Sequence, residues 1–489
     1  MAGPDRATPD DTQDTALTAA LRRADLTLEQ LWTRYFALGG DADLMDLDAH
    51  LAGLLRLPPG ELDVLAHAVN ERLDEVIAAH RVPYSRPVRQ GRPRSGPLAA
   101  LVELLMSAGA APPERLASIA IDAGRALGVE LSIYLIDHEQ RGLVHLPPGG
   151  RPSGPPLGLD GTLPGRAFRT LRILSSDREQ RPRLYVPLVD GADRLGILEA
   201  RLKDPADLYD PSLREQLTWV ASLLGHLIAS MGGYGDELER PRRNRPLSAS
   251  AELIWQQLPP LTAATDSFVL AGMLEPSYNV GGDAFDYALS ERTVSLAIFD
   301  AMGHGISASL MAAAALAGYR SARRDARGVY DQSRAIDDVI SATFPGSAFV
   351  TGVLADLDLA TGRLRFINAG HPPPLLLREG KVIKELTGGN RVPFGLETAG
   401  LTVAEEKLEP GDWLALYSDG VVEARNAAGQ WFGEELLVDF LTREMAASQP
   451  PAETVRRLTQ SVLGHQGGLL QDDATILLAT WRREPPGGG

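Results

Sequence analysis

The chain has 489 residues, of which 44% are hydrophobic and 23% charged, a composition typical of globular proteins with enough length for about three domains. Its formal net charge of −16 argues against nucleic acid or an anionic membrane as a partner. The absence of cysteine excludes disulfides, thiolate zinc sites and cysteine nucleophiles. No signal peptide or membrane-spanning apolar run is visible, so the sequence predicts a cytoplasmic protein.

The first part of the chain is predicted to be helical. Leucine and valine recur at helical spacing between Ala16 and His80, and Pro58-Pro59-Gly60 separates two of these segments. Residues 81–97 are rich in Arg, Pro and Gly, which is typical of a linker. We therefore expect a helical N-terminal module with its Arg/Pro-rich linker over residues 1–92.

A mixed α/β region follows. Residues 114–127 form an amphipathic pattern, and Glu130 to Ile136 alternates as a half-buried strand does. Leu184 to Leu188 and Leu195 to Ala200 predict a hairpin across Asp190-Gly191. Together with the segment Gly161 to Phe168, this region resembles a GAF domain. The resemblance implies a GAF-like α/β sensor domain over residues 93–236, with a possible small-molecule ligand.

The helix that ends this region has two interpretations. Its apolar residues follow an alternating four–three spacing: Leu213, Leu217, Val220, Leu224, Leu227 and Met231. That spacing predicts a coiled-coil seam, and hence a homodimer, but a helix packed on the sheet of its own domain shows the same stripe. The sequence leaves both open.

Four acidic stations mark the last half of the chain. Each has an Asp beside Gly or another small residue, next to an apolar run that predicts a buried strand. The stations are Gly281-Gly282-Asp283, Asp300 to Gly305, Ser418-Asp419-Gly420 and Asp472-Asp473-Ala474-Thr475. Carboxylates brought together at strand ends repel one another unless a cation neutralises them. Hard oxygen ligands without cysteine favour Mg²⁺ or Mn²⁺ over zinc.

The order of these stations resembles the metal-dependent protein phosphatases (PPM, type 2C), in particular the SpoIIE branch. Asn368 to Pro373 (NAGHPP) is also similar to that branch, and the resemblance covers residues 247–483. It implies a multi-domain α/β (α+β) protein whose C-terminal domain, residues 261–483, is a PPM-type αββα sandwich phosphatase. Residues 484–489 are expected to be a disordered tail.

The resemblance also implies roles for individual residues. Asp300 would bridge two divalent cations, Mn²⁺ or Mg²⁺, and the Ala301 carbonyl would bind one of them. Asp283, Asp419 and Asp472 would complete the metal shells, so that these four aspartates act in catalysis through a metal-bound water. Asp473 is expected behind the ligands or as a weaker ligand. Gly303 and Gly305 are expected to let the backbone come close.

One position departs from the family pattern. Relatives place a His, proposed as the general acid, two residues after the bridging Asp, whereas this chain has Met302 there and His304 two residues further on. His304 is interpreted as a turn residue, with a displaced proton donor as the alternative. His371, in the Gly-His-Pro turn, is expected to be structural.

The segment between the two large domains, residues 237–260, is expected to hold a linker and a regulatory helix. Leu247, Ala251, Ile254 and Leu258 share one face of a short helix that ends at Pro259-Pro260. A helix this short must bury that stripe, either on the phosphatase core or on a second copy of the chain. We expect it to act as a switch, and a permanently docked core helix is the alternative.

These patterns predict a bacterial sensor protein serine/threonine phosphatase. Its substrate would be a phosphorylated partner protein, plausibly an anti-sigma-factor antagonist, and the GAF-like domain would control it. One alternative is a pseudophosphatase that only binds partners. Another is a nucleotide cyclase, because Gly281 to Phe285 (GGDAF) differs by one residue from the Gly-Gly-Asp-Glu-Phe hairpin of diguanylate cyclases, with Ala284 replacing the acid.

Overall fold

The computed structural model describes most of the chain and divides it into two compact units, Met1–Pro93 and Arg94–Gly489. The described residues are 9–76, 95–149, 154–177, 181–275, 281–344, 346, 348–396, 400–468, 470 and 472–482. Of the predicted linker at 81–97, residues 81–94 lie outside them, as does the predicted tail at 484–489, whereas Pro97 is the first residue of a helix rather than part of a linker. Within the described part of the chain, no helix is both long and apolar enough to cross a membrane.

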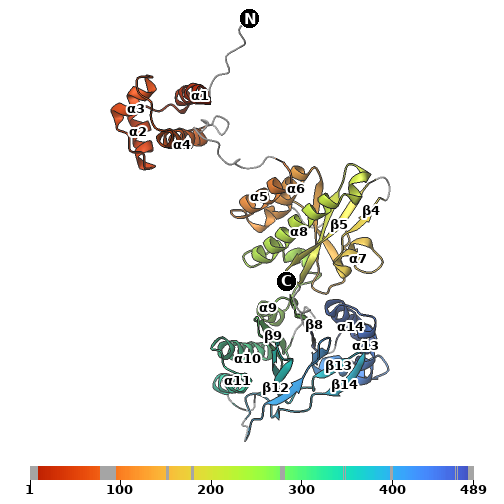
Figure 1. Cartoon of the computed structure of the whole chain (residues 1–489). Helices are drawn as coiled ribbons and strands as arrows, with labels where there is room; N and C mark the ends of the chain where they lie inside the picture. Colours follow the sequence, from red (N-terminus) through yellow and green to blue (C-terminus); the bar gives the residue numbers. More distant parts are fainter. Residues whose placement is uncertain are drawn as a thin grey trace. The chain divides into compact units, whose positions relative to one another are not determined.

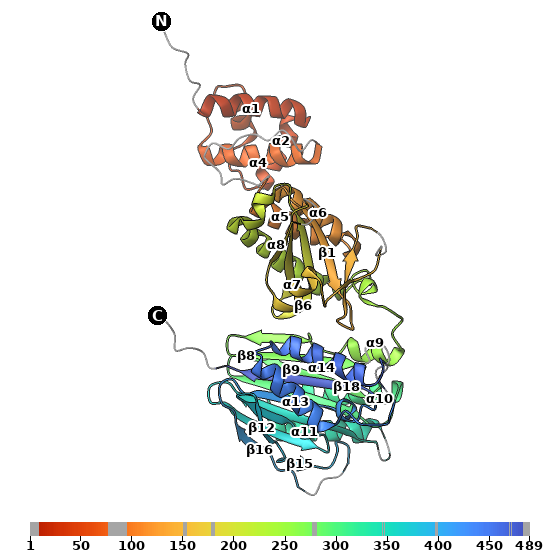
Figure 2. The ribbon, with the colours of Figure 1, turned by 90° about the vertical axis from the view of Figure 1, so that its right-hand side faces the viewer.

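The first unit consists of helices that share one apolar core. They are α1 (Pro9–Ala24), α2 (Leu28–Ala37), α3 (Leu44–Leu51) and α4 (Pro59–Val76). Helix α2 begins at a capping box, in which the Thr27 hydroxyl accepts from the Gln30 N–H and the Gln30 side chain accepts from the Thr27 N–H. Leu47 and Leu65 are fully buried between the helices, and α1 lies along α4 (Figure 2).

The second unit begins with an α/β domain, here called the middle domain (residues 95–236). Its helices are α5 (Pro97–Ala108), η1 (Pro113–Arg115), α6 (Leu116–Leu127), α7 (Leu163–Thr170), η3 (Pro205–Tyr209) and α8 (Pro211–Gly232). Its strands are β1 (Glu130–Ile136), β2 (Gly142–Leu146), β3 (Leu157–Gly158), β4 (Leu174–Ser176), β5 (Arg183–Asp190) and β6 (Asp193–Arg201). They form one antiparallel sheet in the order β3-β2-β1-β6-β5-β4, with the predicted hairpin as β5–β6.

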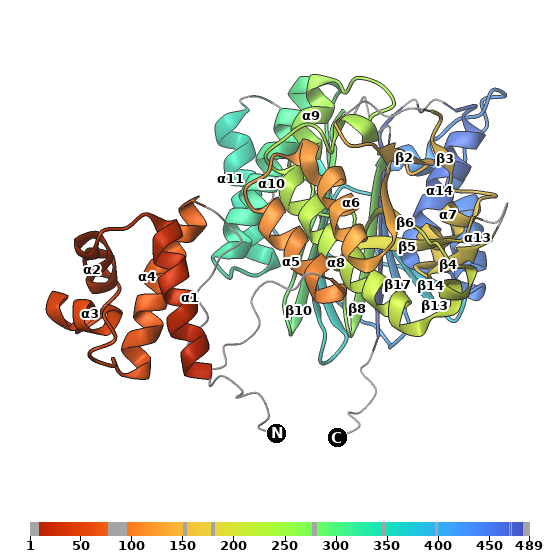
Figure 3. The same ribbon diagram turned by 90° about the horizontal axis from the view of Figure 1, so that it is seen from above.

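Alternation along the strands gives this sheet two apolar faces. Leu131, Ile133 and Leu135 of β1 pack with the core under α5, α6 and α8, whereas Ile136 packs with α7 on the other face. Figures 1 and 3 show α5, α6 and α8 together on one side of the sheet. The heptad stripe of α8 belongs to this core, where Leu217, Val220, Leu224 and Met231 are all buried. Of the two interpretations of that stripe, the structure shows the helix packed on its own sheet.

The C-terminal domain is a four-layer sandwich, as predicted. Its helices are α10 (Ile306–Arg324), α11 (Val329–Thr343), α12 (Asp419–Val422), α13 (Gly433–Ala446) and α14 (Pro451–His465). Its first sheet has the order β15-β12-β11-β10-β9, with β16 also paired to β12: β9 (Asp283–Leu289), β10 (Thr293–Ala301), β11 (Val350–Asp358), β12 (Arg363–Ala369), β15 (Asn390–Arg391) and β16 (Ala404–Lys407). Its second sheet has the order β14-β13-β17-β18-β8-β7: β7 (Thr262–Thr265), β8 (Phe268–Glu275), β13 (Leu375–Arg378), β14 (Lys381–Glu385), β17 (Trp413–Tyr417) and β18 (Ala474–Trp481).

The layers follow from which faces are apolar. Leu270 of β8 and Leu296 of β10 lie in one core cluster, which joins the two sheets to each other. Helices α10 and α11 cover the first sheet, and α13 and α14 cover the second, as Figure 1 shows edge-on. The sandwich brings the ends of strands from both sheets together, so that loops distant in sequence meet.

The predicted regulatory helix is shorter than expected and is docked. After the short helix η4 (Arg240–Arg242), helix α9 spans only Ala249–Trp255, capped by the Ser248 side chain. Ile254 is fully buried in the core cluster of the C-terminal domain, and α9 packs against α10. In this structure the apolar stripe is therefore covered by the chain's own C-terminal domain.

Candidate metal centre

Two of the four acidic stations lie side by side on the first sheet. Asp283 begins β9 and Asp300 lies near the end of β10, and the two residues are direct partners in the antiparallel ladder. The apolar run from Val294 to Phe299 forms β10, which carries Asp300 to the sheet's end. Asp283 is 2% exposed. The prediction that an apolar run leads Asp300 to the end of a strand is confirmed.

The other two stations meet at the end of the second sheet. Ser418 and Asp419 follow β17, and Asp472 and Asp473 precede β18, which is the antiparallel neighbour of β17. The Ser418 N–H donates to the Thr475 carbonyl (3.0 Å), which extends the ladder by one step. Asp419 and Asp473 are thereby placed at the same edge of the sandwich.

Hydrogen bonds connect the two pairs of stations. One carboxylate oxygen of Asp473, Oδ2, accepts from the backbone N–H groups of Gly281 (2.5 Å), Gly282 (2.8 Å) and Asp283 (3.4 Å). The Ser418 hydroxyl donates to Asp283 Oδ2 (2.6 Å) and accepts from the Thr475 N–H (2.9 Å). All four predicted stations are therefore brought to one place, and Asp473 organises the loop that carries Asp283.

Two glycines make this close approach possible. A Cβ on Gly420 would lie 1.9 Å from the Asp473 carbonyl oxygen, and one on Gly282 would lie 2.4 Å from the Ala301 carbonyl oxygen. Gly303 and Gly305 serve a different purpose from the one predicted. A Cβ on either would meet nothing within 4 Å, but their φ angles of +90° and +73° require the left-handed region that glycine favours.

The carboxyl groups raise one another's pKa. Burial, reinforced by Asp419, Asp472 and Asp473, raises the pKa of Asp300 to about 7. Burial, Asp300 and Asp473 raise the pKa of Asp283 well above its ordinary value, although the Ser418 hydrogen bond acts in the opposite direction. Each ionised carboxylate thus makes the ionisation of its neighbours less favourable, and a bound divalent cation would remove this repulsion.

The donor set fits a hard divalent cation. The converging side chains offer carboxylate oxygens, and the Ala301 carbonyl lies at the end of β10 beside Asp300. Among the described residues, no three His, Asp or Glu side chains lie close enough together to coordinate one metal ion. The fit therefore rests on the chemistry of the donors and on their mutual repulsion.

The two positions that depart from the family pattern are both exposed. Met302 is 43% exposed, and its N–H donates to the Phe349 carbonyl. His304 is exposed in the turn before α10, between Gly303 and Gly305. His371, in contrast, is buried: burial lowers its pKa to about 3, its Nδ1 lies 3.0 Å from the Thr351 hydroxyl, and its backbone N–H donates to Asn368.

Sequence reasoning gave no separate role to Ser418 and did not predict the backbone contacts of Asp473. Ser418 was seen only as part of the Ser-Asp-Gly station, yet its hydroxyl connects Asp283 to Thr475. Asp473 was expected behind the ligands, and the structure shows it holding three consecutive backbone N–H groups. The spacing of the stations carries no signal for either bond, because the partners are more than fifty residues apart.

Comparison with known proteins agrees with this geometry. Residues 290–482 match the family model described as Stage II sporulation protein E (SpoIIE). Protein IcfG of Synechocystis sp. is 24% identical over 238 residues, which are 43% of this chain and 37% of that protein. Phosphoserine phosphatase RsbU of Bacillus subtilis is 24% identical over 302 residues, 58% of this chain and 85% of that one. The chain thus spans little more than a third of the first of these relatives.

Solved structures are also similar to part of the chain. The crystal structure of the RsbU and RsbW domains of Rv1364c from Mycobacterium tuberculosis is 24% identical, covering 45% of this chain and 61% of that one with a TM-score of 0.40. The chain is therefore similar to the SpoIIE family model over residues 290–482, and one of its curated relatives is named a phosphoserine phosphatase.

Proposed function

We propose that the chain is a metal-dependent protein serine/threonine phosphatase. The observation that carries the proposal is the convergence of the four acidic stations at one end of the sandwich. Asp283, Asp300, Asp419 and Asp472, with the Ala301 carbonyl, would hold two divalent cations, Mn²⁺ or Mg²⁺. When bound, such ions supply an activated water and stabilise the charge on the phosphoryl oxygens.

The chain's own residues hold this arrangement in place. The Asp473 carboxylate holds the Gly281–Asp283 segment by accepting hydrogen bonds from the backbone N–H groups of that segment. The Ser418 hydroxyl orients the Asp283 carboxylate. Such supporting contacts typically change metal affinity when removed. Gly282 and Gly420 let the supported segments approach without a clash. In this proposal Asp473 is a positioning residue behind the ligands.

The proposed substrate is a phosphorylated protein. The similarity to RsbU, which is named a phosphoserine phosphatase, supports phosphoserine as the target group. An anti-sigma-factor antagonist is the partner that we propose from the resemblance to the SpoIIE branch. The net charge of −16 gives no support for a nucleic-acid partner.

We also propose that the parts before the phosphatase domain regulate it. A six-stranded antiparallel sheet with helices on both faces supports a GAF-like sensor as the middle domain, so a small-molecule ligand belongs to this proposal. Helix α9 contacts both domains, since Trp255 lies against the His138 ring of the middle domain (5.3 Å between centroids) and Ile254 lies in the phosphatase core. It stays the proposed switch, and a homodimer stays a prediction for light scattering to test.

Hydrolysis of p-nitrophenyl phosphate by the purified full chain tests the function. We expect turnover with Mn²⁺ or Mg²⁺, loss of turnover with a chelator, and a fall by orders of magnitude in Asp300→Asn and Asp419→Asn. Asp325→Asn is the matched control, because Asp325 is a surface residue with 59% of its side chain exposed. Turnover close to that of the parent in both site variants would overturn the assignment.

The same experiment separates the alternatives. A folded parent that binds Mn²⁺ without turning over a phosphoserine peptide would be the predicted pseudophosphatase. The phosphatase proposal is favoured over the cyclase interpretation, because residues 290–482, which carry three of the four acidic stations, match the SpoIIE family model. Incubation with nucleoside triphosphates is expected to give no cyclic product.

A further inference from the structure

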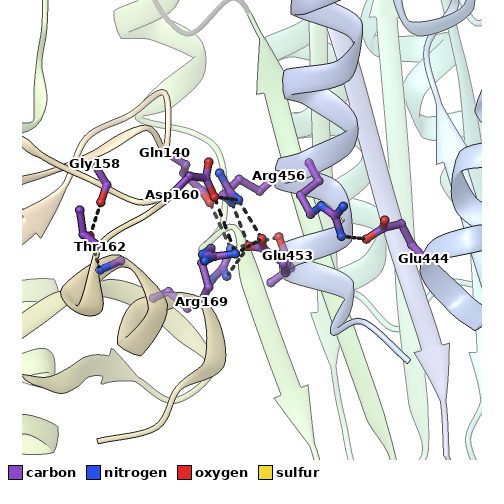
Figure 4. Close-up of polar contacts among 12 residues, drawn as sticks. Gln140, Gly158, Asp160, Thr162, Arg169, Glu444, Glu453 and Arg456 are labelled. Atoms are coloured by element: carbon purple, nitrogen blue, oxygen red, sulfur yellow. Dashed lines mark hydrogen bonds and ion pairs between the residues drawn. The ribbon is translucent and has the colours of Figure 1, made fainter. Parts of the chain in front are cut away.

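Charged side chains connect the middle domain to helix α14 of the phosphatase domain. They are Asp160, Arg169 and Arg194 of the middle domain and Glu453 and Arg456 of α14, and together we call them the α14 joint (Figure 4). Glu453 lies at the centre. It accepts two hydrogen bonds from Arg456 (2.7 and 2.8 Å) and pairs with Arg169 (3.5 Å) and Arg194 (4.0 Å).

Two hydrogen bonds of the joint cross directly between the domains. Arg194 Nη2 donates to the Ala452 carbonyl in the first turn of α14 (3.0 Å), and Arg456 Nη2 donates to Asp160 (3.3 Å). Arg194 is itself held in the middle domain, by Gln140 and by the ring of Phe168. The first turn of α14 is therefore attached to a fixed point of the middle domain.

The centre of the joint, Glu453 with Arg456 and Arg194, is buried but incompletely compensated, whereas Asp160 and Arg169 at its edge are partly exposed. Arg456 is 2% exposed and Glu453 is 3% exposed, yet Arg456 Nη1 and Arg169 Nε lack a hydrogen-bond partner. Buried charges repay the cost of leaving water only when their hydrogen bonds are complete. A contact of this kind is specific in geometry without being strongly favourable, so a change in the middle domain can alter it.

Helix α14 leads from this joint to the metal centre. Leu458 and Val462, on its buried face, share a core cluster with Val421 and Ala474. Val421 lies two residues after Asp419, and Ala474 directly follows Asp473. A small cavity remains between these four side chains and Ile476. The packing between α14 and both carboxylate-bearing segments thus has room for a small shift.

We propose that the α14 joint lets the middle domain set the positions of Asp419 and the Asp472–Asp473 segment. Glu453 and Arg456 are then positioning residues, and α14 is the rigid element between them and the metal centre. Its fifteen residues span about 22 Å, so a slight tilt at the first turn displaces the far end. The inference rests on the proposed function, because it concerns how that metal centre is controlled.

The test is Arg194→Gln in the full chain, which removes the guanidinium that donates to the Ala452 carbonyl and pairs with Glu453. Two readouts are Mn²⁺ binding by isothermal titration calorimetry and amide hydrogen exchange of α14 by mass spectrometry. We expect Mn²⁺ binding to weaken about fivefold or more, the lower end of typical coupling between sites, and exchange in α14 to accelerate. Arg201→Gln, on the same strand but 47% exposed and outside the joint, is expected to change neither.

A second variant guards against misfolding. Arg169→Gln removes a side chain that is 28% exposed, and it is expected to change both readouts in the same direction. Folded variants that keep the parent's Mn²⁺ affinity and α14 exchange would overturn the inference. A parent protein without Mn²⁺-dependent turnover would contradict the proposed function alone. Hydrogen exchange in α14 tests the joint independently, because it does not require turnover.

Discussion

The Ser418 hydroxyl donates to Asp283 Oδ2 at 2.6 Å, which joins the second sheet of the sandwich to the first at the metal centre. Ser418 is fully buried. Because Asp283 is also buried, this donor is one of the few groups that stabilise its charged form.

Ser418→Ala is therefore expected to weaken Mn²⁺ binding by about tenfold or more, the usual effect of removing a supporting contact behind a metal ligand. The free energy of unfolding should fall by about 1–3 kcal/mol, because Asp283 loses a buried donor. Calorimetry with Mn²⁺ and urea unfolding measure the two effects. The control is Ser295→Ala, which removes a hydroxyl that donates to Asp356 at the same distance, 2.6 Å, outside the proposed ligand set. Equal Mn²⁺ affinities in the two variants would contradict the prediction.

Gly420→Ala should abolish most of the activity. The new methyl carbon would lie 1.9 Å from the Asp473 carbonyl oxygen, so either Asp419 or the Asp473 segment must move. Gly464→Ala in α14 is the matched control, because a Cβ there meets nothing within 4 Å and alanine favours helix by about 1 kcal/mol. Phosphatase assays and thermal unfolding of both variants check this. An active Gly420→Ala enzyme would show that the close approach is dispensable.

His304→Ala is expected to change the rate only modestly. The side chain is exposed, in a turn shaped by the two flanking glycines. Rates on a phosphoserine peptide and on p-nitrophenyl phosphate should be compared. A fall of about a hundredfold or more on the peptide alone would instead identify His304 as the proton donor for a poor leaving group.

Glu239 predicts a dependence of stability on pH. Burial alone would raise its pKa, but the His138 hydrogen bond and the nearby Arg242 and Arg243 lower it to about 2. A pKa below the ordinary 4.5 means that this stabilisation is complete above about pH 5 and declines as the pH falls toward 2. The stability difference between the parent and Glu239→Gln should therefore shrink by about 1 kcal/mol between about pH 6 and pH 3.5. Urea unfolding at both pH values measures it, and a difference that stays constant or grows would be the contrary result.

Local sequence patterns predicted the strands of the site well. The apolar runs before Asp300 and Asp419 are β10 and β17, and the run after Asp473 is β18, because a buried strand needs only a short apolar stretch between turn residues. The strand at Glu130–Ile136 and the β5–β6 hairpin followed from the same alternation.

Contacts between distant residues were beyond that reasoning. Nothing in the local sequence pairs Arg194 with a helix 258 residues away, or Asp473 with Gly281. The α8 stripe was ambiguous for a related reason, since helices packed on a sheet and helices in a coiled coil bury the same spacing of side chains. Only the three-dimensional neighbours distinguish them.

The bond between Asp473 and Gly281 spans 192 residues and has a consequence for synthesis of the protein. Strand β18 lies between β17 and β8, inside its sheet, although it is made almost 200 residues after β8. During synthesis, the loop that carries Asp283 therefore lacks its hydrogen bonds to the Asp473 carboxylate until β18 has emerged from the ribosome. A nascent chain should therefore be unable to remove phosphate from a partner, and activity should begin only once the whole domain has left the exit tunnel.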